Sequence, residues 1–173
     1  MHDHTYQVSV RWTGDRGTGT TGYREYGRDH VVSASGKHDL LGSADPTFRG
    51  DRDRWNPEEL LTAALAQCHM LSYLHVAVTE GFTVLAYEDR ATAALNLNRD
   101  GSGEITGATL HPVVTIAEPD RVADAEAAHA TANGLCFIAR SVAFPVHHEA
   151  LVRVRETDSD AALGADSSTR AAD

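Results

Sequence analysis

Cysteine is scarce in this sequence: Cys68 and Cys136 are its only two among 173 residues. Two cysteines are too few for the disulfide scaffold that holds small secreted domains together. No uninterrupted apolar run reaches the ~18 residues of a transmembrane helix, and the N-terminus lacks the charged-then-apolar pattern of a secretory signal. We therefore expect a cytoplasmic protein with no membrane partner.

The chain also has few positively charged residues. The chain has 15 Lys and Arg residues against 25 Asp and Glu residues, a formal net charge of -10 at pH 7. An acidic domain repels the phosphate backbone of DNA and RNA, so we expect no nucleic-acid partner. The length suits one domain, expected over residues 1–156. The small, polar and acidic composition of residues 157–173 predicts a disordered tail.

The clearest element is an apolar helix that begins after Asn56. Asn is a favourable N-cap, Pro57 suits the first helical position, and the two glutamates that follow favour the positive end of a helix. Gly81 is expected to stop the helix after Glu80. Because apolar side chains lie nearly all round it, the sequence predicts a buried helix and not one lying on the surface.

Strand-like patterns precede this helix. Alternating apolar and polar residues predict a half-buried strand over 5–13. A second strand is expected over 23–33. Residues 41–55 combine Gly, Ser, Asp and Pro with alternating charges, which predicts a long ordered loop.

Strand-like patterns also follow the helix. Segments 82–97 and 104–117 are rich in β-forming residues and flank Asp100-Gly101, which marks a hairpin. The remaining expectations are a second helix, a helical turn and a last strand, over 119–133, 135–142 and 146–154. This order predicts an α+β fold with antiparallel sheets packed around the buried central helix.

The two cysteines stand in contexts that favour redox chemistry. Cys68 lies late in the apolar helix, where a thiol can be shielded from bulk water yet reached from a cleft. A cysteine that attacks a peroxide must be a thiolate, which needs a cation or strong donors nearby. A second cysteine such as Cys136 can then trap the oxidised sulfur as a disulfide. Two inert buried thiols would be the ordinary interpretation of the same pair.

The segment Asn56-Pro57-Glu58-Glu59-Leu60-Leu61, with the Ala-rich stretch that leads to Cys68, resembles the signature of the OsmC/Ohr family. This family comprises osmotically inducible protein C and the organic hydroperoxide resistance proteins. Cys136, between an Ala/His-rich helix and a closing β segment, is the second matching region. The resemblance extends over residues 6–155. It implies an OsmC-like fold in an intertwined homodimer, with two active sites at the subunit interface.

The resemblance also implies an activity. Members of this family reduce organic hydroperoxides to alcohols in a thiol-dependent reaction. Cys68 would be the peroxidatic cysteine and Cys136 the resolving one, and Glu58 matches the glutamate that holds an activating arginine. No metal or organic cofactor is implied. Reducing equivalents come from an external thiol, which is a lipoylated protein in some members.

Two arginines compete for the activating role. In hydroperoxide resistance members the arginine comes from the early hairpin, where Arg28 is the closest match, one residue out of register. In other members it precedes the Asn-Pro-Glu segment, where Arg49 fits better, and we favour Arg49. The ordinary alternative for either residue is a solvated surface charge.

The spacing of Glu58 and Cys68 bears on the dimer. Ten residues separate them, which is ~15 Å along a straight helix. That distance is too great for one tightly held arginine to serve both. If both belong to one site, Glu58 comes from the partner subunit, unless the helix breaks.

Two departures from better-known members leave other functions open. His69 follows Cys68 where Phe or Tyr is more usual, and Phe137 follows Cys136 where Pro is common. The alternative is a non-enzymatic small-ligand or redox-sensing protein on the same fold. A Cys-His hydrolase or transferase is a weaker option, since it needs a histidine within hydrogen-bond reach of Cys68.

The spacing of the ten histidines does not favour a metal site. Adjacent helical residues diverge by ~100°, so we expect His69 to be a packing or pocket residue and not the activator of Cys68. His129 could approach the site through the second helix, but we expect it on the exposed surface. His147 and His148 are expected to face opposite sides of a strand.

Overall fold

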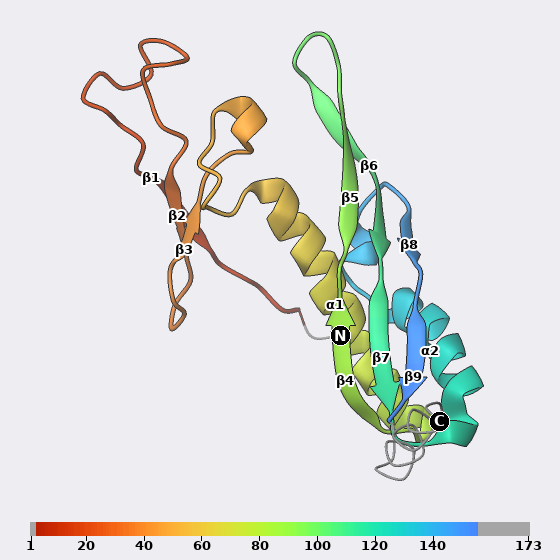
Figure 1. Ribbon diagram of the computed structural model, residues 1–173. Helices are drawn as coiled ribbons and strands as arrows, with labels where there is room; N and C mark the ends of the chain where they lie inside the picture. Colours follow the sequence, from red (N-terminus) through yellow and green to blue (C-terminus); the bar gives the residue numbers. More distant parts are fainter. Residues whose placement is uncertain (1–2, 156–173) are drawn as a thin grey trace, which may run out of the picture. The chain divides into compact units, whose positions relative to one another are not determined.

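The computed structural model describes residues 3–155 and divides into two compact units, which we describe separately (Figure 1). The first unit extends to Leu61 and the second begins at Thr62. Helix α1 (Pro57–Glu80) begins in the first unit and continues into the second. One domain over residues 1–156 stays a prediction, and the tail predicted over 157–173 lies outside the described residues.

The first unit contains a three-stranded antiparallel sheet in the order β1-β2-β3. Its strands are β1 (Ser9–Trp12), β2 (His30–Ser33) and β3 (Leu40–Gly42). The strands predicted over 5–13 and 23–33 are present but shorter, and β1 is exposed along its whole length instead of half-buried.

The prediction of a loop over 41–55 missed most of β3. Leu40 and Leu41 pair with β2, and the backbone N–H of Trp55 donates to the Leu41 carbonyl at 3.2 Å. A strand of three residues carries almost no local pattern, so only its long-range partners reveal it. The rest of the segment is loop, except for a short 3₁₀ helix, η1 (Pro46–Phe48).

Both ends of α1 lie where the sequence predicts them. At the N-terminus the Asn56 side-chain oxygen accepts from the Glu59 backbone N–H at 2.8 Å, and the Glu59 carboxylate accepts from the Asn56 N–H at 3.2 Å. This reciprocal pair is a capping box. At the other end Gly81 adopts φ 77°, a conformation that glycine reaches without a Cβ clash.

Burial of α1 differs from the expectation. The helix is buried along one stripe, while Leu71 and Val78 on other faces are 62% and 79% exposed. By length and composition alone α1 could also cross a membrane. That is weak support for a span, because core helices of soluble proteins meet the same criterion. The exposed apolar side chains instead indicate surface that this single chain leaves uncovered.

The second unit has two three-stranded sheets, in the orders β4-β7-β9 and β5-β6-β8. Within each sheet one pair is antiparallel (β4 with β7, β5 with β6) and one is parallel (β7 with β9, β6 with β8). The strands are β4 (Val84–Asp89), β5 (Thr92–Leu97), β6 (Gly103–Leu110), β7 (Pro112–Ile116), β8 (Val146–His148) and β9 (Leu151–Val154).

The α+β class is confirmed, but the expectation of antiparallel sheets holds only in part, because each sheet of the second unit also contains a parallel pair. The two segments of β-forming residues over 82–97 and 104–117, and the last strand predicted over 146–154, each contain two strands that belong to different sheets. A break of one or two residues is enough to pass the chain from one sheet to the other. Such a short break hardly disturbs the apolar pattern, so the sequence did not reveal it. The expected hairpin at Asp100-Gly101 joins β5 to β6.

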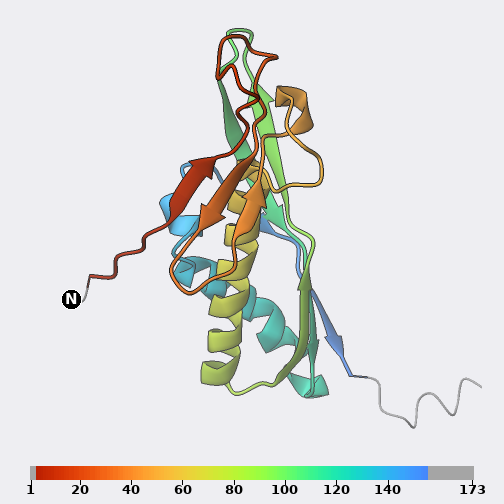
Figure 2. The same cartoon turned by 90° about the vertical axis from the view of Figure 1, so that its left-hand side faces the viewer.

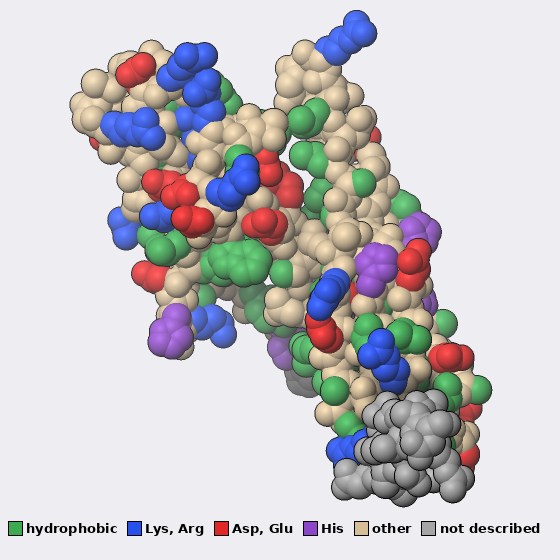
Figure 3. Space-filling model, viewed as in Figure 1, with side chains coloured by type: hydrophobic (Ala, Val, Ile, Leu, Met, Phe, Trp, Pro, Cys, Tyr) green, Lys and Arg blue, Asp and Glu red, His purple; other side chains and the backbone are tan. Residues whose placement is uncertain are grey.

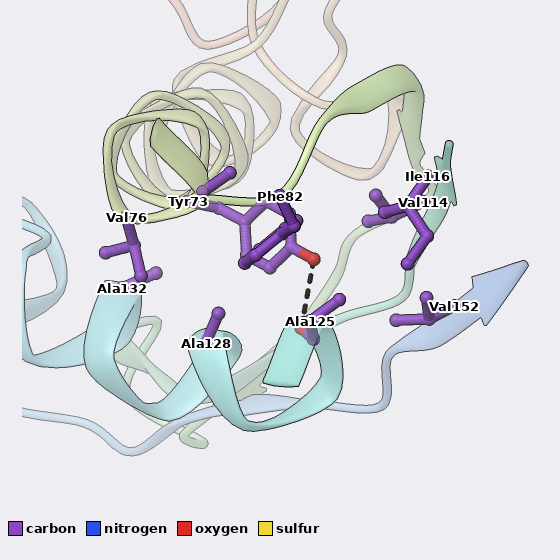
Figure 4. Packing of buried hydrophobic residues seen from close by; sticks show 10 residues of the cluster. Tyr73, Val76, Phe82, Val114, Ile116, Ala125, Ala128, Ala132 and Val152 are labelled. Atoms are coloured by element: carbon purple, nitrogen blue, oxygen red, sulfur yellow. Dashed lines mark hydrogen bonds between the residues drawn. The ribbon is translucent and has the colours of Figure 1, made fainter. Parts of the chain in front are cut away.

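Helix α2 (Val122–Leu135) lies beside α1 on the same face of the β4-β7-β9 sheet (Figure 2). Two short 3₁₀ helices flank it, η2 (Pro119–Arg121) and η3 (Ala139–Ser141), so the predicted helix and helical turn are both confirmed. Tyr73 of α1 donates its hydroxyl proton to the Ala125 carbonyl of α2 at 2.9 Å (Figure 4). Around this contact packs an apolar core that includes Val76, Phe82, Val114, Ile116, Ala128, Ala132 and Val152.

Stacked histidine rings lie between the two helices. His69 Nε2 is 3.0 Å from His129 Nδ1, and the two rings are nearly parallel, with centroids 5.4 Å apart. The Tyr73 ring stacks on His129 at 4.1 Å, and His148 of β8 stacks on His69 at 5.6 Å. The predicted surface position of His129 is wrong: it is 1% exposed, because it lies on the face of α2 that carries Ala125, Ala128 and Ala132.

Burial also changes the acid–base properties of this pair. Loss of hydration, with a smaller contribution from the nearby His148, lowers the pKa of His69 from 6.5 to about 4. Burial, with smaller contributions from His69 and His148, lowers the pKa of His129 to about 3. Both rings are therefore neutral at pH 7, and each can offer one N–H and one bare nitrogen.

Acidification is expected to destabilise the protein through this pair. In the unfolded chain both histidines take up protons near pH 6.5, but in the folded protein only near pH 4 and pH 3. Below pH 6.5 the unfolded state binds more protons than the folded state, so the free energy of unfolding decreases as the pH decreases. The maximum fall is about 1.4 kcal/mol per pH unit for each histidine. Urea denaturation between pH 7 and pH 4 measures this slope.

A His69→Gln/His129→Asn double variant should show a shallower fall over the same pH window. His147→Gln is the matched control, because His147 is exposed and lies outside the stack, and it should keep the wild-type slope. The same slope in the wild type and the double variant would contradict the assignment.

Candidate active site

The two cysteines meet within the second unit. Cys68 is half-buried on α1, and Cys136 is buried at the residue that ends α2. Their side chains interact with each other, although 68 residues separate them in sequence. Both are free thiols. The fold thus brings together the two sulfurs that the sequence singled out.

Burial holds the Cys136 thiol in its protonated form. Loss of hydration, with a smaller contribution from the neighbouring Cys68, raises the pKa of the Cys136 thiol to about 11. Cys136 is therefore a neutral thiol near neutral pH, and it lies beside the half-buried Cys68 sulfur.

A tight turn holds Cys136 in place. The Ala139 backbone N–H donates to the Cys136 sulfur at 3.4 Å, and the Arg140 N–H donates to the Cys136 carbonyl at 3.1 Å. The neighbouring Phe137 is 80% exposed, and its carbonyl accepts from the Ser141 hydroxyl at 2.8 Å. The buried sulfur therefore has a fixed position, and the residue that follows it in sequence is an exposed aromatic.

Glu58 lies in the first turn of α1 and is half-buried. The helix is continuous from Pro57 to Glu80, so the break that would shorten the helical path from Glu58 to Cys68 is absent. A single chain therefore cannot bring Glu58 and Cys68 together through a break in α1.

Arg28 is held firmly inside the first unit. Its guanidinium donates to the Tyr26 carbonyl at 2.6 Å and to the Tyr23 carbonyl at 2.9 Å. The same group lies 4.3 Å from the Tyr23 ring centroid and 4.2 Å from that of Tyr26. These carbonyl bonds and cation–π contacts fix the side chain within its own turn.

Arg49 is exposed and more loosely held. It adopts φ 67° at the end of η1, and its guanidinium lies 5.8 Å from the Tyr23 ring centroid. The Tyr23 hydroxyl reaches the Phe48 carbonyl at 3.5 Å. The two candidate arginines therefore share one tyrosine within the first unit.

Sequence reasoning missed the aromatic partners of these cations. Tyr23 and Tyr26 precede Arg28 by five and two residues, and this close spacing of two tyrosines and an arginine is the signal that could have indicated stacking. His148 was likewise placed on a strand face but not connected with His69. Only the pairing of β8 with β6 brings it near the helices.

A histidine partner for Cys68 is not found. Among residues 3–155, no hydrogen bond joins Cys68 to a histidine ring, and His69 and His129 bond to each other instead. This arrangement argues against the Cys-His hydrolase, which needs such a bond. The same residues contain no group of three or more His, Cys, Asp or Glu side chains that could hold a metal ion.

Comparison with known proteins agrees with the fold. An OsmC-like protein of unknown function from Vibrio cholerae is 30% identical, over 87% of this chain and 100% of that one, with a TM-score of 0.76. An organic hydroperoxide resistance protein OsmC from Legionella pneumophila is 21% identical, over 88% of this chain and 100% of that one, with a TM-score of 0.63. An organic hydroperoxide resistance protein from Bacillus subtilis is 21% identical, over 87% of this chain and 98% of that one, with a TM-score of 0.58.

The sequence-based comparison is consistent with these structures. No curated protein matches the chain. The family model of OsmC-like proteins matches residues 50–150, which include the first turn of α1 and both cysteines. This match covers more than half of the chain, and the Vibrio cholerae relative covers most of it. The chain therefore belongs to the OsmC-like protein family.

Proposed function

We propose that this protein is a thiol-dependent peroxidase that reduces organic hydroperoxides to alcohols. The observation that carries the proposal is the meeting of the two cysteines, with Cys68 half-buried on α1 and Cys136 buried beside it at the end of α2. This arrangement gives a peroxide one sulfur that it can reach and places a buried thiol where it can close a disulfide. The relatives from Legionella pneumophila and Bacillus subtilis are organic hydroperoxide resistance proteins, which supports the substrate class.

The proposed reaction begins at Cys68. Its thiolate attacks one peroxide oxygen, so that an S–O bond forms as the O–O bond breaks, and the alcohol leaves after taking up one proton. The sulfur is oxidised by two electrons to a sulfenic acid, and the peroxide is reduced by two. Cys68 suits this step better than Cys136, because it is half-buried whereas Cys136 is 1% exposed.

The second step uses Cys136. Its sulfur attacks the sulfenic sulfur of Cys68, an S–S bond forms as the S–O bond breaks, and the thiol proton leaves with the hydroxide as water. Burial makes Cys136 a weak nucleophile towards external electrophiles, but its position beside Cys68 compensates for this. An external dithiol, such as a lipoylated protein, then reduces the disulfide by exchange. We place this cycle in the cytoplasm, where such reductants keep thiols reduced.

An arginine held by Glu58 would stabilise the Cys68 thiolate in this scheme. Arg49 suits the role better than Arg28, since the Arg28 guanidinium is already bonded to two carbonyls and stacked between two rings. Arg49 is exposed, and its cation–π contact at 5.8 Å leaves its donors available for a carboxylate.

We also propose that the protein works as a homodimer. In the first unit, Val8 and Val10 are 66% and 64% exposed and share one side of the β1 segment. Leu71 and Val78 are exposed on α1 in the second unit, and apolar side chains are visible on the surface of both units in Figure 3. Exposed apolar rows on a strand and a helix favour a partner that covers them. The continuous α1 helix between Glu58 and Cys68 supports a site that needs a second subunit.

Activity depends on Cys68 if the proposal holds. Cys68→Ser should abolish reduction of cumene hydroperoxide in the presence of dihydrolipoamide, a loss of at least about a thousandfold, because serine is not ionised at neutral pH. Peroxide consumption at a fixed dithiol concentration measures it. Cys136→Ser is the matched control, since in the absence of added dithiol it should still consume one equivalent of peroxide and stop at the sulfenic acid.

Full activity of Cys68→Ser would contradict the peroxidase proposal. Failure of the wild type to consume any peroxide would instead favour a small-ligand or redox-sensing protein on the same fold.

The dimer can be tested on β1. Val10→Asp puts a charge on the exposed apolar side of the strand and should shift the protein towards the monomer in sedimentation velocity, with a parallel loss of peroxidase activity. Arg11→Asp is the control, since successive residues of a strand face opposite sides, and it should leave the dimer intact. A wild type that is monomeric and active at high dilution would rule out the dimer proposal.

A further inference from the structure

In the described part of the chain, two side-chain hydrogen bonds join residues within α1 to residues within α2, besides the bond that the Arg121 guanidinium at the N-cap of α2 donates to the Glu80 carbonyl at 2.7 Å. One runs from the Tyr73 hydroxyl to the Ala125 carbonyl, and the other joins His69 to His129. His69 directly follows Cys68 on α1, and His129 precedes Cys136 by seven residues on α2. The histidine bond therefore connects the two helices that carry the two sulfurs.

Beyond its N-cap, the face of α2 that packs on α1 offers little else to fix its register. Its other buried residues are Ala125, Ala128 and Ala132. Small side chains of this kind let helices approach closely, but their smooth surface tolerates sliding and rotation. His129 is the one buried polar side chain of α2. Its ring is the side chain of this face that makes a directional contact with α1, whereas the bond from Tyr73 uses the Ala125 backbone carbonyl.

This contact is not an efficient source of stability. His69 and His129 are fully buried, and the atoms His69 Nδ1 and His129 Nε2 have no hydrogen-bond partner. Buried polar atoms are normally paired, and each unpaired one destabilises the folded state. A buried polar pair that costs stability yet makes one well-aligned bond is the pattern seen where polar groups specify register.

We propose that the bond between His69 and His129 fixes the register of α2 against α1 and so holds the Cys136 sulfur within reach of Cys68. Both histidines are positioning residues in this proposal, which rests on the proposed peroxidase function. They act on the second step, in which the sulfenic acid of Cys68 and the thiol of Cys136 form a disulfide and release water. The first step, attack of Cys68 on peroxide, does not depend on them.

The ring atoms in the bond suggest matched variants. His129 bonds through Nδ1, whose position the side-chain amide of asparagine can occupy, and His69 bonds through Nε2, whose position the amide of glutamine can reach. Leucine removes the bonding atom at either position. His129→Asn and His69→Gln therefore keep a bond that His129→Leu and His69→Leu lose.

The test has two measurements. The first is the equilibrium constant for formation of the Cys68–Cys136 disulfide in a buffer of reduced and oxidised glutathione, measured by thiol alkylation. The second is the rate of disulfide closure after one equivalent of cumene hydroperoxide. Each leucine variant should lower the equilibrium constant for disulfide formation about tenfold, which corresponds to about 30 mV in reduction potential. Closure should slow by a similar factor, while the rate of sulfenic acid formation is unchanged. The asparagine and glutamine variants should stay close to wild type.

A His69→Leu/His129→Leu double variant separates positioning from stability. It removes both unpaired nitrogens, so its free energy of unfolding should match or exceed that of the wild type, while disulfide formation remains weakened. His147→Leu is the control outside the stack and should behave as wild type.

The outcomes distinguish this inference from the proposed function. A wild-type equilibrium constant in the stable double variant would overturn the inference alone. A wild type that forms no Cys68–Cys136 disulfide with either oxidised glutathione or cumene hydroperoxide would overturn the proposed function and this inference with it.

Discussion

The site depends on how closely α2 packs against α1. Alanines at 125, 128 and 132 leave room for the Tyr73 ring, whose hydroxyl reaches the α2 backbone. Without that close approach the end of α2 could not bring the Cys136 sulfur to the middle of α1. The proximity of the two thiols is therefore a product of helix packing, and the chemistry proposed for them depends on the alanine face of α2.

Environment separates the roles of two chemically identical side chains. Cys136 is buried, accepts a hydrogen bond from a backbone N–H and has a raised pKa, whereas Cys68 is half-buried. The neighbouring histidines are neutral because burial lowers the pKa of both rings. Near neutral pH they therefore act through the geometry of their hydrogen bond and through packing, and not through charge. Activation of the Cys68 thiolate in our account therefore falls to an arginine, and not to the histidine next to it in sequence.

Local signals in the sequence were sufficient for some parts of this account and not for others. The capping box at Asn56, the stop at Gly81 and the hairpin at Asp100-Gly101 are written in a few adjacent residues, and all three lie where predicted. The division of residues 146–154 into two strands depends on partners far along the chain, as does the burial of His129. The family motif indicated the two cysteines but could not show that Cys136 is buried while Cys68 is half-buried.

The most direct test of the central claim is mass spectrometry of the reduced protein after one equivalent of cumene hydroperoxide. The account predicts rapid loss of two hydrogens and a peptide pair linked through Cys68 and Cys136, both reversed by a dithiol. Under the same conditions Cys136→Ser should instead form a sulfenic acid at Cys68 that dimedone traps. Two cysteines that stay fully alkylatable after the peroxide has been added would contradict the account.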